Sequence, residues 1–271
     1  MHYYEFMEKI RLRNNIRKIT PAQLIIFGFI GLILSGTLLL MLPISNRHHV
    51  MTPFLDALFT ATSASCVTGL VVHDTAQYWS LFGQIVILCL IQIGGLGVIT
   101  MAILLSIFRK KKIGFRQRFI MQQSISAPRL EGIIRNTKWI LKAVLLIETI
   151  GMLLLSIRFI PQFGIVKGLW FSIFHSISAF CNAGFDLMGQ KQSYSSLTNY
   201  IDDSFISNVI CLLIIIGGLG FFVWIDILTN KFKFHRYSLH SKIVLTTTTI
   251  LLIGGSAFFF FNDFSHWHIL K

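Results

Sequence analysis

The sequence has 271 residues, of which 54% are hydrophobic and only 13% are charged. A soluble domain has about a quarter of its residues charged, so the composition excludes an ordinary soluble protein. The formal net charge is +13, but the basic residues lie in blocks between long apolar runs. This arrangement argues against a nucleic-acid-binding protein and predicts a polytopic membrane protein.

The four cysteines lie in apolar or small-residue surroundings, with no CxxC pair and no nearby pair of histidines. Neither a zinc site nor a disulfide framework is therefore indicated. The first eighteen residues are polar and basic, and no small-residue cleavage site follows the first apolar run. We therefore expect no removable signal peptide.

The first part of the chain predicts two membrane spans with a shorter helix between them. The spans are residues 21–42, bounded by Pro21 and Pro43, and residues 81–108, which end at a block of one arginine and three lysines. The segment between them, residues 53–65, has about 13 residues and reaches only ~20 Å as a helix. It is too short to cross a bilayer, so we expect a half-helix that enters the membrane and stops.

The same order then repeats along the chain. Residues 139–160, closed by Pro161, predict a third span; residues 169–179 predict a second half-helix; and residues 205–228 predict a fourth span. A last apolar run covers residues 243–261.

The distribution of lysine and arginine predicts the orientation, because short loops rich in these residues stay in the cytoplasm. Residues 1–20, 109–142 and 228–242 together carry 19 of the 24 basic residues, whereas residues 43–80 and 161–204 carry three. We therefore expect a cytoplasmic N-terminus, and half-helices that enter from the opposite side.

An internal repeat relates the two half-helices. Residues 58–70 (LFTATSASCVTGL) align with residues 173–185 (IFHSISAFCNAGF) with five identities in thirteen positions, and each following span carries the pentapeptide IGGLG. Both units begin and end on the same side, so the repeats are parallel and related by an axis along the membrane normal, where a pore can run.

The segments after the half-helices predict an ion filter. Non-helical backbone at membrane depth is tolerated where it lines a water-filled path, and its carbonyl oxygens can replace the hydration shell of a monovalent cation. Glycine can adopt dihedral angles that turn carbonyls toward one axis, although each glycine alone is also compatible with a simple turn. The predicted filter residues are Cys66, Val67, Thr68 and Gly69 with Cys181, Asn182, Ala183 and Gly184, and the predicted cation-entrance residues are Asp74 and Asp186.

The two loop motifs, each followed by an IGGLG span, resemble the first two pore units of the Trk/Ktr/HKT potassium transporters, and most closely the Ktr-type membrane subunits. The resemblance covers residues 21–261 and implies an all-α fold of four units around one pore, each unit with one filter glycine. It implies transport of K⁺ and no covalently bound cofactor, and it makes Na⁺ a candidate coupling ion. It further implies a bacterial plasma-membrane location, a second copy of the subunit and a cytosolic nucleotide-binding ring.

On this basis we divide the chain into two complete units and the first helix of a third, and we expect a truncated form. The expected parts are a cytoplasmic N-terminus (1–20), pore unit 1 (21–108), a cytoplasmic connector (109–138), pore unit 2 (139–228), a second connector (229–242) and the start of unit 3 (243–271).

Two other functional classes remain open. A non-conducting scaffold or inactive fragment fits the missing half of the resemblance. An intramembrane enzyme would use His73 or His175 as a base and Ser63 or Ser65 as a nucleophile. It has less support, because no catalytic motif is present and His175 aligns with Thr60, so no catalytic set repeats. Two further carboxylates receive no role. Glu148 has Arg158 of a neighbouring unit or a pore-facing group as candidate partners, and Asp226 fits an interfacial charge near the following lysines.

Overall fold

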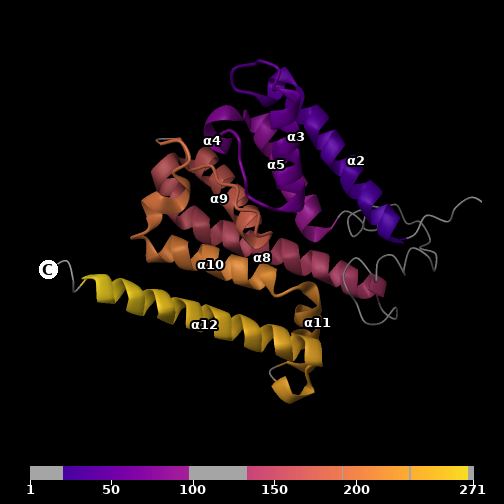
Figure 1. Ribbon diagram of the computed structural model, residues 1–271, viewed down its shortest axis with the longest axis vertical. Coiled ribbons are helices and arrows are strands. Elements are labelled where there is room, and N and C mark those ends of the chain that lie inside the picture. The colour runs from indigo at the N-terminus through magenta and orange to yellow at the C-terminus, as the bar shows by residue number, and fades with distance from the viewer. Residues whose placement is uncertain (1–20, 98–132, 191, 232, 268–271) are drawn as a thin grey trace, which may run out of the picture.

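The computed structural model describes residues 21–97, 133–190, 192–231 and 233–267, and within these ranges the chain is helical, with no β-strand. The predicted cytoplasmic N-terminus, most of the first connector and the end of the span predicted over residues 81–108 lie outside the described residues. Figure 1 shows two groups of packed helices, followed by a long helix that lies apart from them.

The first group contains two long helices and a half-helix packed against both. They are α2 (Pro21–Met41), α3 (Phe54–Cys66) and α5 (Leu81–Leu96), with short turns η1 (Pro43–Ser45) and α4 (Thr75–Tyr78) on the connections. Helix α3 has 13 residues. The prediction of a half-helix followed by non-helical backbone is confirmed for this unit.

The second group repeats this arrangement. Half-helix α9 (Ile165–Phe180) packs between α8 (Ile133–Phe163) and α10 (Ser204–Gly218), with the turn η2 (Ser196–Tyr200) on the connection to α10. Helix α8 continues past the end predicted at Pro161, which lies within its last turn. Proline removes one hydrogen-bond donor but does not stop the helix here, because Gly164 N–H still donates to Ile160 O, 2.9 Å away.

The fourth predicted span, residues 205–228, is wrong as a single straight helix. Helices α10 and α11 (Phe221–Asn230) meet at 89°. Between them Gly220 has a φ of 85°, and Gly97, the last residue of the first IGGLG sequence, ends α5 with a φ of 84°. Positive φ is easily adopted by glycine and does not continue a right-handed helix, so the last glycine of each pentapeptide ends its helix.

The last helix, α12 (Leu239–Trp267), follows the turn η3 (Phe234–Arg236) and contains the predicted apolar run 243–261. Its contacts with the rest of the chain are mainly with α11, and its apolar window is 0% buried (Figure 1). Asp226 of α11 accepts hydrogen bonds from Ser238 N–H (2.8 Å) and Asn230 Nδ2 (2.6 Å), so this carboxylate links α11 to the start of α12.

By length and hydropathy, two described helices are able to span a membrane alone, Thr137–Phe163 and Leu239–Phe261. The bent pair α10–α11 makes a third if it is counted as one span.

A glycine of each IGGLG sequence lies against the backbone of the half-helix in the same unit. A methyl group added to Gly94 would collide with the carbonyl oxygen of Ser65, and one added to Gly217 would collide with that of Phe180. Ser65 and Phe180 are equivalent positions of the repeat. The same contact in both units thus lets the span approach the half-helix closely, as small residues do between membrane helices.

The two units meet through α5 and α9, and one polar contact within this region joins α5 to α8. Gln92 Nε2 of α5 donates to both carboxylate oxygens of Glu148 in α8, at 2.9 and 3.2 Å. Glu148 is 6% exposed, and its backbone oxygen accepts a hydrogen bond from Ser176 Oγ of α9 (2.7 Å). Within the chain, Arg158 Nε lies 3.5 Å from Asp203 Oδ2, and a pairing of Glu148 with Arg158 of a neighbouring unit stays a prediction.

We expect Glu148→Ala to destabilise the chain by about 1–3 kcal/mol, because Gln92 would lose its buried acceptor. Glu148→Gln retains an acceptor oxygen of similar shape and serves as the matched control. Thermal unfolding in detergent micelles checks this prediction. Equal stability of the alanine variant and the parent would show that the contact contributes nothing.

We expect Gly217→Ala to lower the unfolding temperature strongly, because the added methyl meets a backbone oxygen that cannot move without shifting α9. Gly254→Ala in α12 is the control, since a methyl there meets nothing within 4 Å. The same unfolding assay, run on both variants, compares them. Similar behaviour of the two would contradict the packing argument.

Candidate functional site

The first loop turns sharply after α3 through two residues with positive φ. Val67 has φ 55° and ψ 47°, and Gly69 has φ 76°. Positive φ is uncommon for a β-branched residue, and such conformations cost of order 1–3 kcal/mol. The turn is held by hydrogen bonds from Val67 N–H to Ala64 O (3.4 Å) and from Thr68 N–H to Ser63 O (3.0 Å). The hydroxyl groups of Ser63 and Thr68 also lie 2.8 Å apart.

The second loop follows the same backbone path. Asn182 has φ 57° and Gly184 has φ 72°, at the positions that align with Val67 and Gly69. Ala183 N–H donates to Ser178 O at 2.8 Å, the bond that corresponds to Thr68 and Ser63. The repeat seen in the sequence is therefore a repeat of dihedral angles and hydrogen bonds. Asparagine tolerates the left-handed region better than valine, so the second loop carries less strain.

The two loops lie against each other at their glycines. A methyl group at Gly69 would lie 2.7 Å from Ala183 O and 3.2 Å from Gly184 Cα, and one at Gly184 would lie 3.3 Å from Gly69 Cα. A side chain at either position would therefore press on the opposite loop. The structure brings the two predicted halves of the filter together at this contact.

The backbone carbonyls of both loops accept no hydrogen bond from the part of the chain that the structure describes. Among the described residues, no N–H or O–H group donates to the carbonyl oxygens of 66–69 or 181–184. Each loop follows the C-terminal end of a half-helix, where the helix dipole places partial negative charge. Unpaired carbonyl oxygens at such an end can coordinate a monovalent cation. The side chains of Cys66, Thr68 and Asn182 are exposed, whereas Val67 and Cys181 are half-buried and Ala183 is buried.

Asp74, predicted at the cation entrance, has its carboxylate engaged by backbone donors. Oδ1 accepts from Ala76 N–H (2.9 Å) and Gln77 N–H (3.0 Å) at the start of α4, and Oδ2 accepts from Tyr194 N–H (2.7 Å) of the second unit. The side chain is buried and joins the connecting segments of the two units. A direct role in attracting cations stays a prediction.

Asp186, the second predicted entrance residue, is half-buried. Its Oδ1 accepts from Met188 N–H at 2.8 Å, and it lines a cavity of about 220 Å³ together with Asn182 and Gly184. It therefore lies beside the second loop, and its role at an entrance also stays a prediction.

The imidazole of His175 in α9 is held by backbone groups on both sides. Its Nδ1 lies 2.7 Å from Phe171 O, and its Nε2 accepts from Leu187 N–H at 3.3 Å. The ring is 2% exposed. Both nitrogens bond to backbone groups, which ties α9 to the chain that follows the second loop and leaves neither nitrogen available as a general base.

Sequence reasoning missed two pairings near the loops. The partner of Glu148 is Gln92, whose Oε1 also lies 4.0 Å from the thiol of Cys181 in the second loop. Asp56 in the first turn of α3 pairs with His73 beyond the first loop. The partners in each pair are far apart in sequence, and no local pattern joins them. The one available signal was the presence of Glu148 inside an apolar run, which indicates that this carboxylate needs a partner.

Comparison with known proteins agrees with this geometry. The TrkH family model, described as a cation transport protein, matches residues 9–264. The chain is 46% identical over 236 residues to the potassium/sodium uptake protein NtpJ of Enterococcus hirae, covering 87% of this chain and 51% of that protein. It is 44% identical over 229 residues to the Ktr system potassium uptake protein B of Bacillus subtilis, covering 84% of this chain and 50% of that protein.

A third relative, the Ktr system potassium uptake protein B of Vibrio alginolyticus, is 38% identical over 224 residues, covering 82% of this chain and 48% of that protein. The chain spans about half the length of the curated relatives it matches. The family match covers both loops and every described helix up to α12, and on this evidence the chain is a multi-pass membrane protein that belongs to the TrkH family of cation transport proteins.

Proposed function

We propose that this chain forms part of the pore of a potassium uptake system, with K⁺ as its cargo. The observation that carries the proposal is the set of eight carbonyls, four at the C-terminal end of each half-helix, to which no described residue donates a hydrogen bond. Backbone oxygens replace the hydration shell of K⁺ in filters of this kind. The loops contain no carboxylate between residues 66 and 69 or between residues 181 and 184. The negative potential at the loops is therefore supplied by backbone dipoles rather than by charged side chains.

The names of the relatives support the choice of ion. One is named for potassium and sodium uptake and two for potassium uptake in a Ktr system. We propose K⁺ as the transported ion, with Na⁺ as a candidate coupling ion. The filter residues are those predicted from the sequence, with Gly69 and Gly184 setting the backbone path.

We propose a plasma-membrane location with the N-terminus in the cytoplasm and the two loops open to the outside. The distribution of lysine and arginine supports this orientation, because the segments on the loop side carry three of the 24 basic residues. The chain supplies two loops of the four that the family resemblance implies. A second copy of the subunit and a cytosolic nucleotide-binding ring are the proposed partners, and the word "system" in the relatives' names supports an assembly of several components.

The test is growth at limiting K⁺, with rubidium uptake, in bacteria that lack their own K⁺ importers. The cells express the 271-residue chain with a regulatory ring subunit of a relative, either alone or joined to the C-terminal half of the Enterococcus hirae relative. Rescue by either form supports the pore. A chain that is present in the membrane but rescues growth in neither form would instead be a non-conducting scaffold.

We expect Gly69→Ser or Gly184→Ser to weaken the preference for K⁺ over Na⁺ about tenfold in the conducting form, which corresponds to about 1.4 kcal/mol of lost discrimination. The physical reason is the contact between the loops, which leaves no room for a side chain. Gly31→Ser is the control, because a side chain at this exposed position in α2 meets nothing. Competition between rubidium and sodium during uptake measures the preference. Unchanged discrimination would contradict the filter assignment.

A further inference from the structure

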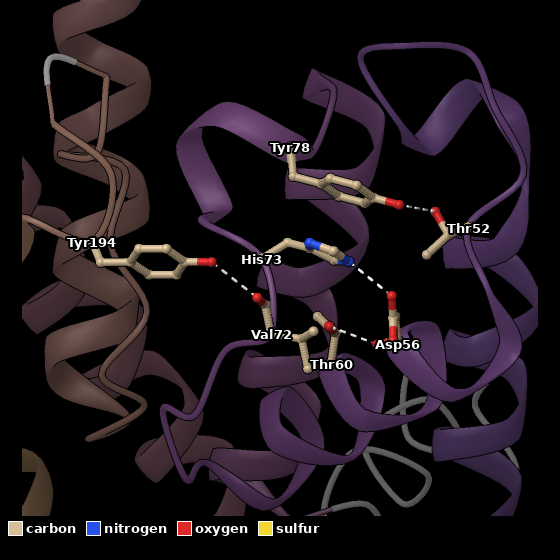
Figure 2. Close-up of polar contacts among 7 residues, drawn as sticks. All are labelled: Thr52, Asp56, Thr60, Val72, His73, Tyr78 and Tyr194. Atoms are coloured by element: carbon tan, nitrogen blue, oxygen red, sulfur yellow. Dashed lines mark hydrogen bonds and ion pairs between the residues drawn. The ribbon is translucent and has the colours of Figure 1, made fainter.

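The chain that leaves the first loop is held by few polar contacts. Among the described residues, no N–H group from Gly69 to His73 donates to a protein acceptor. Two side-chain contacts hold this return segment: Tyr194 Oη of the second unit donates to Val72 O (2.9 Å), and His73 Nε2 lies 2.8 Å from Asp56 Oδ2 (Figure 2). Of these two polar contacts, the His73–Asp56 pair is the one that ties the segment after the first glycine back to α3.

This pair links the two ends of the pore loop. Asp56 lies in the first turn of α3, which leads into the loop, and His73 lies four residues after Gly69. The imidazole ring also stacks on Tyr78 with ring centres 3.9 Å apart, and Tyr78 Oη donates to Thr52 Oγ1 at 3.3 Å (Figure 2). The side chains of His73 and Asp56 are 31% and 28% exposed, so protons from solvent reach the pair.

The second unit holds its return segment with a different histidine in a different environment. Leu187, which aligns with Val72, donates its N–H to Nε2 of His175. His175 is 2% exposed and bonds to backbone groups through both nitrogens. The two loops thus share their backbone conformation and differ in how they are held: the first by a partly exposed His73–Asp56 hydrogen bond, the second by a buried imidazole.

The other charged groups around His73 are already engaged elsewhere. Asp74 accepts three backbone N–H groups, as described above. Arg47 donates from Nε to Trp79 O at 3.1 Å. Tyr78 contacts His73 through its ring face, while its hydroxyl group points to Thr52. Asp56 is therefore the carboxylate that faces the imidazole.

We propose that the His73–Asp56 pair is a positioning clamp for the first filter loop alone, and that outside acidity tightens it. The proposal rests on the proposed function, which places this face outside the cell. Histidine changes charge between about pH 5 and 8. When His73 is neutral, its Nε2–H donates an ordinary hydrogen bond to Asp56. When the ring is protonated the bond joins opposite charges, and such bonds are about twice as strong.

The first test measures hydrogen exchange of the Val67 and Thr68 amides in the full 271-residue chain in lipid nanodiscs. These amides donate to Ala64 and Ser63 and hold the turn between α3, which carries Asp56, and the segment that carries His73. After correction for the intrinsic effect of pH, we expect exchange to be about fivefold slower at pH 5.5 than at pH 8. The amides of Asn182 and Ala183 in the same sample are the internal control and show no such difference, because His175 is buried.

Three variants separate the clamp from other effects of pH. His73→Gln and Asp56→Asn each remove one charge and abolish the difference at the first loop. His48→Gln, which changes an exposed histidine on the segment between η1 and α3, leaves it intact. Exchange in α8 verifies that each variant is folded. A pH difference that persists in Asp56→Asn, or that is equal in both loops, would overturn the proposal.

A second readout links the clamp to selectivity. In the conducting form, we expect the preference for K⁺ over Na⁺ to be about two- to fivefold higher at an outside pH of 5.5 than at pH 8, and Asp56→Asn to abolish this change. A pH-dependent loop in a chain that conducts in no form would contradict the proposed function and leave the clamp standing. Selective transport with no pH effect on the first loop would contradict the clamp and leave the proposed function standing.

Discussion

A glycine laid directly on a backbone carbonyl is the contact on which both units depend. Gly94 meets Ser65 O, and Gly217 meets Phe180 O. A loop without regular structure at membrane depth must be enclosed by protein, because lipid cannot satisfy its polar groups. The close approach of span and half-helix provides that enclosure, and it is possible only because one residue in each span has no side chain.

The same packing determines which carbonyls remain available. Ser63 O and Ala64 O accept hydrogen bonds from the turn, and Ser65 O lies against the span. The first carbonyl of α3 without a donor or a covering glycine is that of Cys66. The start of the segment able to coordinate an ion is thus set by the contacts behind it rather than by the loop residues themselves. Val67, held at positive φ, turns the chain immediately afterwards.

The sequence predicted the parts of the fold that are local and repeated. The half-helices and the positive-φ glycines follow from length, apolar runs and an internal alignment. The bend at Gly220 did not, because the residues after it are as apolar as those before it, and hydropathy does not report direction. The partnership of Gln92 with Glu148 also escaped prediction: the two lie in different units, and the packing of α5 against the second unit, which the sequence does not specify, brings them together.

The right angle between α10 and α11 has a mechanical consequence. Helix α11 has ten residues. It is therefore an arm of about 15 Å, and a rotation of about 10° at Gly220 would move its far end by about 2.6 Å. That end is tied to the start of α12 through Asp226 and Ser238. A small rotation of α11 about Gly220, close to the second loop, would therefore displace the start of α12 sideways. The apolar window of α12 is 0% buried, so this displacement would move a helix with a largely exposed apolar surface.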